Sequence, residues 1–188
     1  KFVPSFQSVV FDPSAPRKIF SDLSSNYEVF RWNMNFSQRS TACITELIYN
    51  IHDHSNQNFG CITINFRNEG KEKVPALFLC VSDLGIGIKN SFLKSNKFSK
   101  YKLKRKGDNY YNLAAVTPGY TCTDKINRGF GLPLVLKEVN KLIISSGCCR
   151  TSFSKDKNDH ELLKTIESKR IKRMVGTSIV AQIKEFNK

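Results

Sequence analysis

The stretch Asp83-Leu84-Gly85-Ile86-Gly87 directly follows a continuous apolar run at 76–81, Ala-Leu-Phe-Leu-Cys-Val, and it decides how the chain is interpreted. An Asp-x-Gly-x-Gly sequence after a strand is often only a turn. Here it has an upstream companion at 46–54 (ELIYNIHDH) and two downstream companions at 128–132 (RGFGL) and 175–177 (VGT). Four such pieces in this order favour a nucleotide site over four unrelated turns.

The size and composition predict one folded domain. With 188 residues, 40% hydrophobic content and 14 Phe, the chain can bury a substantial core. No apolar stretch approaches the roughly 18 residues that a membrane span needs. The six cysteines form no Cys-x-x-Cys pair, so we expect free thiols, no structural zinc and a cytoplasmic location. Because the chain starts at Lys1 without Met or a signal-peptide pattern, we expect a domain excised from a longer protein.

The net charge of +14 is concentrated in two places. Residues 89–106 carry eight bases and no acid, and residues 164–173 carry five more bases. Such runs can attract nucleic acid, an anionic membrane or an acidic protein, or they can be solvated surface. Neither run has the aromatic pattern of an RNA-binding module.

Hydrophobic periodicity predicts a mixture of helices and strands without regular strand–helix alternation. The sequence therefore predicts an α+β fold, a two-layer sandwich with helices on one face of the sheet. Residues 89–127 are polar, basic and too long for an ordinary connection, so we interpret them as a functional lid. The predicted strands are 5–11, 59–67, 75–82, 148–153 and 177–186. The predicted helices are 16–24, 37–54 (with Ser37 as N-cap) and 130–144.

The 37–54 helix presents a line of oxygen-bearing side chains opposite its isoleucine stripe. Glu46, Asn50 and Asp53 are spaced i, i+4 and i+7, and they share an arc of roughly 60°. Carboxylate and amide oxygens suit Mg²⁺, which binds few protein groups and leaves positions for phosphate oxygens. A carboxylate beside such a metal can also orient or deprotonate a nucleophile.

Two glycine-containing segments supply the rest of the predicted site. Asp83 ends a buried strand, where its carboxylate can accept a hydrogen bond from an exocyclic amine such as adenine N6, and Gly85 and Gly87 allow close approach of the backbone. The segment 129–131 (GFG) opens a helix whose free N–H groups can hold phosphate. Two bases just before it, Lys125 and Arg128, can add charge-assisted contacts.

Together, segments 46–50, 83–87, 129–132 and 176–177 resemble the four motifs of the GHKL superfamily of ATPases and kinases. That resemblance implies the Bergerat fold, also called the histidine-kinase-like ATPase fold, with a mixed and mostly antiparallel sheet. It also implies ATP and Mg²⁺ as cofactors. The implied layout is one domain, 1–188, with an N-terminal extension at 1–36, the core at 37–186, an ATP lid at 89–128 and a basic insertion at 155–173.

The resemblance also implies individual roles. Asn50 would bind Mg²⁺ and Glu46 would be the general base. Asp83 would read adenine with help from the hydroxyl of Thr177, and Asp53 matches an aspartate one turn after the motif's Asn. Gly129 and Gly131 would line the phosphates. The full set of predicted nucleotide-contacting residues is Asn50, Asp53, Asp83, Gly85, Gly87, Lys125, Arg128, Gly129, Gly131, Leu132 and Thr177.

Three functions compete at this point. The first is an ATP-dependent enzyme, either an ATPase or a protein kinase of the histidine-kinase-like or anti-sigma serine-kinase-like type, in the bacterial signalling branch. The second is a non-catalytic module in which ATP orders the lid and so gates a partner surface. The third is a basic nucleic-acid-binding domain with a degenerate pocket. We expect a protein partner or fused domain, do not favour nucleic acid, and leave a homodimer open.

Overall fold

The computed structural model describes residues 5–11, 34–55, 60–69, 74–95, 106–122, 129–155 and 163–184. One sheet runs through this part of the chain, in the order β1-β2-β3-β5-β4. Its strands are β1 (Ser5–Phe11), β2 (Gly60–Glu69), β3 (Val74–Asp83), β4 (Lys141–Lys155) and β5 (Leu163–Lys184). The α+β class is confirmed. All strand pairs of the described sheet are antiparallel, so the expectation of a mixed sheet was wrong for this part of the chain.

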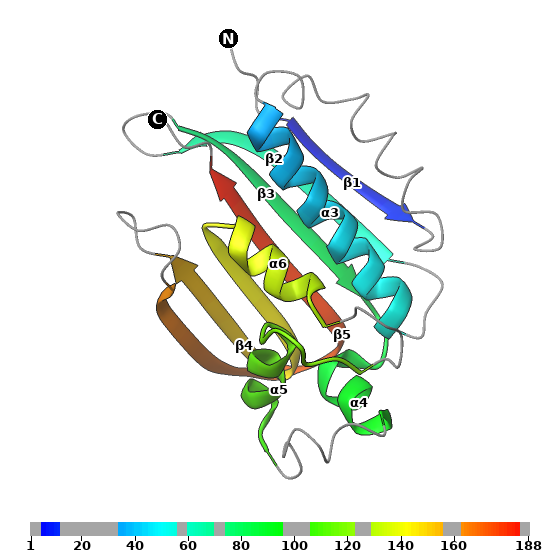
Figure 1. The fold of residues 1–188 in the computed structure, drawn as a ribbon. Helices are drawn as coiled ribbons and strands as arrows, with labels where there is room; N and C mark the ends of the chain where they lie inside the picture. The colour runs from blue at the N-terminus through cyan, green and yellow to red at the C-terminus, as the bar shows by residue number, and fades with distance from the viewer. Residues whose placement is uncertain are drawn as a thin grey trace.

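Strand β4 folds back on itself at Gly147, whose φ of 61° lies in the left-handed region. Lys155 N–H donates to Asn140 O, and Arg150 Nε donates to Ser145 Oγ, so the two halves of β4 lie side by side. The second half of β5 pairs with the first half of β4, and the first half of β5 pairs with the second half of β4. The beginning of β5 therefore forms the outer edge of the sheet (Figure 1).

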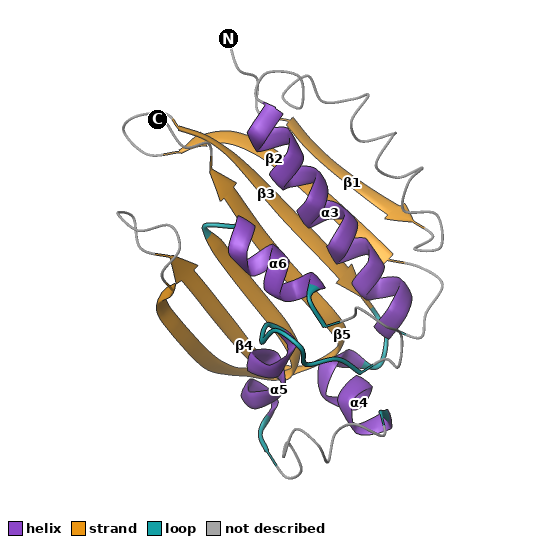
Figure 2. Cartoon of the chain, viewed as in Figure 1, coloured by secondary structure: helices purple, strands orange, loops and turns teal. Residues whose placement is uncertain are grey.

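Two helices lie across one face of this sheet, α3 (Met34–His54) and α6 (Gly131–Glu138) (Figure 2). The isoleucine stripe of α3 is buried there as predicted, because alternate residues of β2, β3 and β5 present apolar side chains to it. The core side chains with the lowest exposure include Ile44, Leu47, Ile48, Ile62, Ile64, Leu77, Leu79, Val135, Leu142, Ile144, Ala181 and Ile183.

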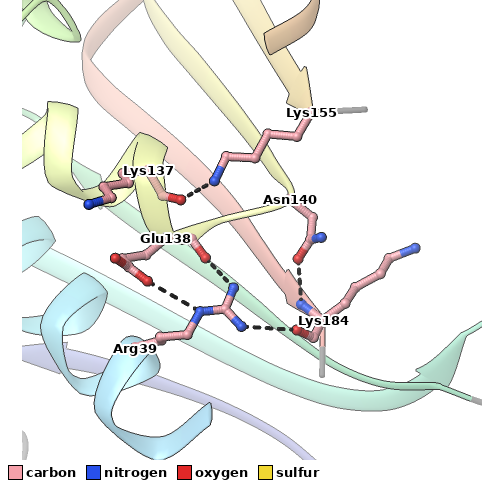
Figure 3. Close-up of polar contacts among 6 residues, drawn as sticks. All are labelled: Arg39, Lys137, Glu138, Asn140, Lys155 and Lys184. Carbon is pink, nitrogen blue, oxygen red and sulfur yellow. Dashed lines mark hydrogen bonds and ion pairs between the residues drawn. The ribbon is translucent and has the colours of Figure 1, made fainter. Parts of the chain in front are cut away.

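A polar cluster joins the helices to the strand ends far from the Asp83 turn (Figure 3). Arg39 of α3 forms an ion pair of 3.2 Å with Glu138 and donates further hydrogen bonds to the carbonyl oxygens of Glu138 and Lys184. Asn140 Oδ1 accepts the N–H of Lys184 at 2.7 Å, and Lys155 Nζ donates to the carbonyl oxygen of Lys137. The end of α6 and the turn into β4 are therefore held by contacts to three other segments, namely α3 and the ends of β4 and β5.

Two predicted boundaries were wrong. The first long helix begins at Met34, so Ser37 lies inside it, and the Ser37 carbonyl oxygen accepts a hydrogen bond from Thr41 Oγ1. The helix predicted over 130–144 ends at Glu138, because the backbone turns extended at Val139 and Asn140 N–H donates to Gln182 O. The strand predicted at 148–153 lies within the longer β4. The strand predicted at 177–186 matches the second half of β5 as far as Lys184, and residues 185–186 lie outside the described residues. The predicted helix at 16–24 lies outside the described residues.

The predicted lid is largely helical where the structure describes it. It contains α4 (Gly87–Lys94) and α5 (Asp108–Ala115), which lie beside each other below α6 (Figure 1). Phe92 and Tyr111 pack with ring centroids 6.0 Å apart and form a small second core with Ala114. This part of the chain is thus a packed helical layer rather than a simple loop.

Candidate functional site

A cavity of about 270 Å³ opens between α3, the end of β3, the middle of β5, the start of α6 and the α4–α5 layer. Its volume is near the lower end of the range of about 300–1,000 Å³ that is usual for ligand pockets. Residues from all four sequence motifs line it. The predicted site residues on its wall are Glu46, Asn50, Asp53, Asp83, Gly87, Gly129, Gly131, Leu132 and Thr177.

Helix α3 presents its polar line to this cavity because its isoleucines are buried on the opposite side. Asn50 Nδ2 donates to the carbonyl oxygen of Glu46 at 2.7 Å. That bond uses a donor of the amide and leaves Oδ1 as an acceptor of the type that Mg²⁺ prefers. The side chain of Asp53 is only 5% exposed, and one of its carboxylate oxygens lies 3.6 Å from His52 Nδ1.

The carboxylate of Glu46 lies against the start of α6. A Cβ atom on Gly131 would fall 2.5 Å from Glu46 Oε2 and 3.6 Å from Asn50 Nδ2, so any larger residue would displace the carboxylate. The N–H groups of the first turn of α6 have no carbonyl partner within the helix. Pro133 in that turn has no N–H to satisfy. A carboxylate, an amide and the positive end of a helix therefore converge at one corner of the cavity.

Asp83 sits at the other end of the cavity, at the last position of β3. Burial raises the pKa of its carboxyl above the usual value, and hydrogen bonds from the N–H groups of Gly85 and Thr177 oppose this shift. The bond from Gly85 N–H to Asp83 Oδ1 measures 2.7 Å. These backbone donors fix the carboxylate without neutralising it.

Gly85 differs from the other predicted residues because it does not line the cavity. The main chain of Ser55 occupies the space beside it, and a Cβ on Gly85 would lie 2.1 Å from Ser55 O. Ser55 O also accepts the N–H of Ile86 at 3.1 Å. Gly85 thus allows the Asp83 turn to pack on the end of α3. Lys125 and Arg128 lie outside the described residues.

Ser146 is a residue of this region that the sequence did not reveal. Its Oγ accepts the N–H of Ile88 at 3.0 Å, and it lies 3.3 Å from Gly176 O and 3.4 Å from Thr177 Oγ1. One buried hydroxyl therefore links the start of α4 to the strand that carries Thr177. It falls in an ordinary-looking Ser-Ser pair before Gly147, which offers no motif.

The described part of the lid closes the remaining side of the cavity. Ile88, Ser91 and Phe92 of α4, Ala115 of α5 and residues 120–122 all face it. Gly119 N–H donates to Gly129 O at 3.0 Å, which joins the end of the lid to the segment before α6. The described residues contain no group of three or more His, Cys, Asp and Glu side chains arranged to hold a metal ion.

A comparison with known protein families found no match to this chain, and neither did a comparison with curated proteins. None of the helices within the described ranges has the length and apolar character needed to cross a membrane.

Proposed function

We propose that this chain is an ATP-binding domain with the Bergerat fold, acting with Mg²⁺ as an ATPase or ATP-dependent protein kinase of the GHKL type. One observation carries the proposal: residues from four motifs, spread along the sequence from Glu46 to Thr177, line a single cavity. Four unrelated turns would have no reason to meet around one volume. The antiparallel sheet with α3 and α6 on one face also supports the proposed fold.

The roles follow from the chemistry of each wall. The Asp83 carboxylate is an acceptor for the exocyclic amine of adenine, and the Thr177 hydroxyl lies on the paired strand beside it. At the other end, the free N–H groups at the start of α6 suit phosphate oxygens. Asn50 Oδ1 would help to hold Mg²⁺, which when bound would neutralise phosphate charge and complete its coordination with phosphate oxygens.

Turnover is favoured over simple binding by the position of Glu46. Its carboxylate lies beside the start of α6, where the proposed terminal phosphate would sit. A carboxylate there can orient a water molecule or a partner hydroxyl and take its proton. In a binding module that only gates a partner surface, nothing would require an acid at this position.

Calorimetric titration of ATP with Mg²⁺ tests the binding site directly. Asp83→Asn should weaken binding by about 10–100-fold. An NH₂ group that replaces the accepting oxygen cannot accept the hydrogen bond from the adenine amine, which is then left buried without a partner. Glu167→Gln makes the same carboxylate-to-amide change at an exposed residue outside the cavity and should leave the affinity unchanged. Wild-type protein that gives no heat, at concentrations able to detect millimolar affinity, would contradict the proposal.

Phosphate release on the same samples tests catalysis. Glu46→Gln should keep ATP binding and lower the rate by about 10²–10⁴-fold, the usual contribution of a general base. An unchanged rate would remove Glu46 from the chemistry. If wild-type protein binds ATP but releases no phosphate and labels no partner, the non-catalytic module is the better description.

A further inference from the structure

The outer edge of the sheet is unusually basic. The first half of β5 lies there (Figure 1), and its residues 166–170 are exposed. Its exposed bases, together with the base opposite them on β4, are Arg150, Lys169, Arg170, Lys172 and Arg173. Glu167 is the one acid among residues 163–175. We call these five bases the basic edge.

The bases point to both sides of the sheet. Lys169 is paired with Arg150, whereas Arg170 is paired with Cys149, which is buried on the helix-covered side together with Thr151 and Phe153. Since paired residues share a face and successive residues alternate, Lys169 and Arg170 lie on opposite faces. Positive charge therefore flanks the edge above and below.

The pairing of Arg150 with Lys169 places two positive side chains directly opposite each other. Such a like-charge pair destabilises a sheet, and an acidic side chain placed next to it would relieve the repulsion. The outward edge of residues 166–172 has no strand partner in the described part of the chain, so its alternate N–H and C=O groups are positioned to pair with another strand.

We propose that the basic edge binds an extended acidic peptide of a partner protein, which adds to the sheet as one more strand. Main-chain hydrogen bonds would supply affinity, and acidic side chains on both faces of the added strand would meet Lys169 on one side and Arg170 on the other. A nucleic acid fits less well, because its phosphates would follow one face and residues 163–175 contain no aromatic side chain on which a base could stack. This inference does not depend on what the cavity binds.

The same bases would have a different consequence if they served only to keep other strands away from an open edge. Lysine is common at edges for that reason. That role predicts that no added strand binds at all, whatever its charge. A binding experiment therefore separates the two explanations.

The experiment is fluorescence anisotropy with a labelled short peptide that repeats Glu-Glu-Thr-Thr (the Glu–Thr peptide), titrated with the full chain at physiological salt. Two consecutive Glu residues place acids on both faces of an extended strand. The expected result is saturable binding that the double change Lys169→Glu/Arg170→Glu weakens by at least about tenfold. The matched control Lys94→Glu/Lys137→Glu reverses the same number of exposed charges elsewhere and should have a much smaller effect. Thermal unfolding checks that each variant is folded, and Lys169→Gln/Arg170→Gln replaces the first pair if it is not.

Two further probes identify the mode of binding. A peptide that repeats Glu-Glu-Pro-Pro (the Glu–Pro peptide) has the same charge but lacks half the N–H groups that a strand needs, so it should bind much more weakly. A single-stranded oligonucleotide of equal charge should also bind more weakly than the Glu–Thr peptide. Equal binding of the Glu–Pro peptide, tighter binding of the oligonucleotide, equal losses in both charge-reversal variants, or no binding of the Glu–Thr peptide would each overturn the proposal.

Discussion

At the scale of single residues, the site depends on places where one main chain passes very close to another. Gly176, next to Thr177 on β5, is the tightest: a Cβ there would lie 2.0 Å from Asp83 O. Its φ of 77° is also a conformation that L side chains rarely adopt. The carboxylate of Asp83 can be held by the Thr177 N–H only because Gly176 lets the two strands approach.

The close approach at Gly176 predicts a large loss of stability on substitution, and Gly119 provides the matched control. Gly176→Ala should destabilise the fold by more than about 3 kcal/mol, because it adds a main-chain clash to the strain of a positive φ. Gly119→Ala has the same strain, with φ of 82°, but nothing lies within 4 Å of the added Cβ, so it should cost only about 1 kcal/mol. Urea unfolding of both variants measures the difference, and equal losses would show that strain rather than close approach dominates.

At the scale of elements, the question is how the helical layer of the lid is attached to the sheet. Asp108, the first residue of α5, accepts the N–H of Cys148 at 2.7 Å, and its other oxygen lies 3.1 Å from Lys89 Nζ on α4. Burial alone would raise the pKa of Asp108, but these two contacts, together with the positive charge of Arg173, outweigh burial and lower it below its usual value. One carboxylate thus joins α4, α5 and the turn of β4.

The lowered pKa predicts a pH-dependent attachment. Because the folded state favours the ionised form, the stabilisation by Asp108 is fully present above the unfolded-state pKa of about 4 and is lost as the pH falls through the lower folded-state value. A double-mutant cycle of Asp108→Asn and Lys89→Met should therefore give a coupling of about 0.5–1 kcal/mol at pH 7. The coupling should disappear as the pH falls well below 4. A coupling that does not change over this range would show that the charge of Asp108 is not what joins the layer to the sheet.

The elements also show how far the sequence could predict the structure. The apolar stripe of α3 and the apolar run of β3 could be predicted from the sequence because both segments are buried in the core, so their apolar residues follow a regular pattern along the chain. The end of α6 was not, because the run from Leu132 to Ile144 keeps helical spacing through Asn140 and contains no glycine, and its only proline, Pro133, lies at the helix start. What ends that helix is tertiary: Asn140 bonds Gln182 and Lys184, which are over forty residues away. The basic start of β5 was interpreted as an insertion because its strand character depends on pairing with β4.

The residues of the candidate site also differ in whether the sequence alone could predict them. Side chains at helical spacing on α3 and residues next to glycines carry their own signal, so Glu46, Asn50, Asp83 and Gly131 could be chosen in advance. Ser146 could not, because its role consists of contacts to Ile88, Gly176 and Thr177 that only folding brings together.

At the scale of the whole molecule, the cavity lies between the sheet with its two helices and the α4–α5 layer, so a ligand there would join both. Binding to the folded state alone stabilises it by about 2.7 kcal/mol at a ligand concentration of 100 Kd. For a chain of this size, that corresponds to a rise in melting temperature of about 5–10 °C. ATP with Mg²⁺ should therefore raise the melting temperature of the wild type, and hydrogen exchange should slow in both α3 and α4.

The net charge of +14 makes the control for this prediction essential, because any polyanion can stabilise so basic a chain by reducing its self-repulsion. Inorganic triphosphate with Mg²⁺ at equal ionic strength measures that general effect, which should be equal in wild type and Asp83→Asn. The additional rise with ATP should occur in the wild type alone, since only the adenine requires the Asp83 carboxylate. If triphosphate matches ATP, or if Asp83→Asn keeps the full rise, the stabilisation comes from charge, and the cavity has no part in it.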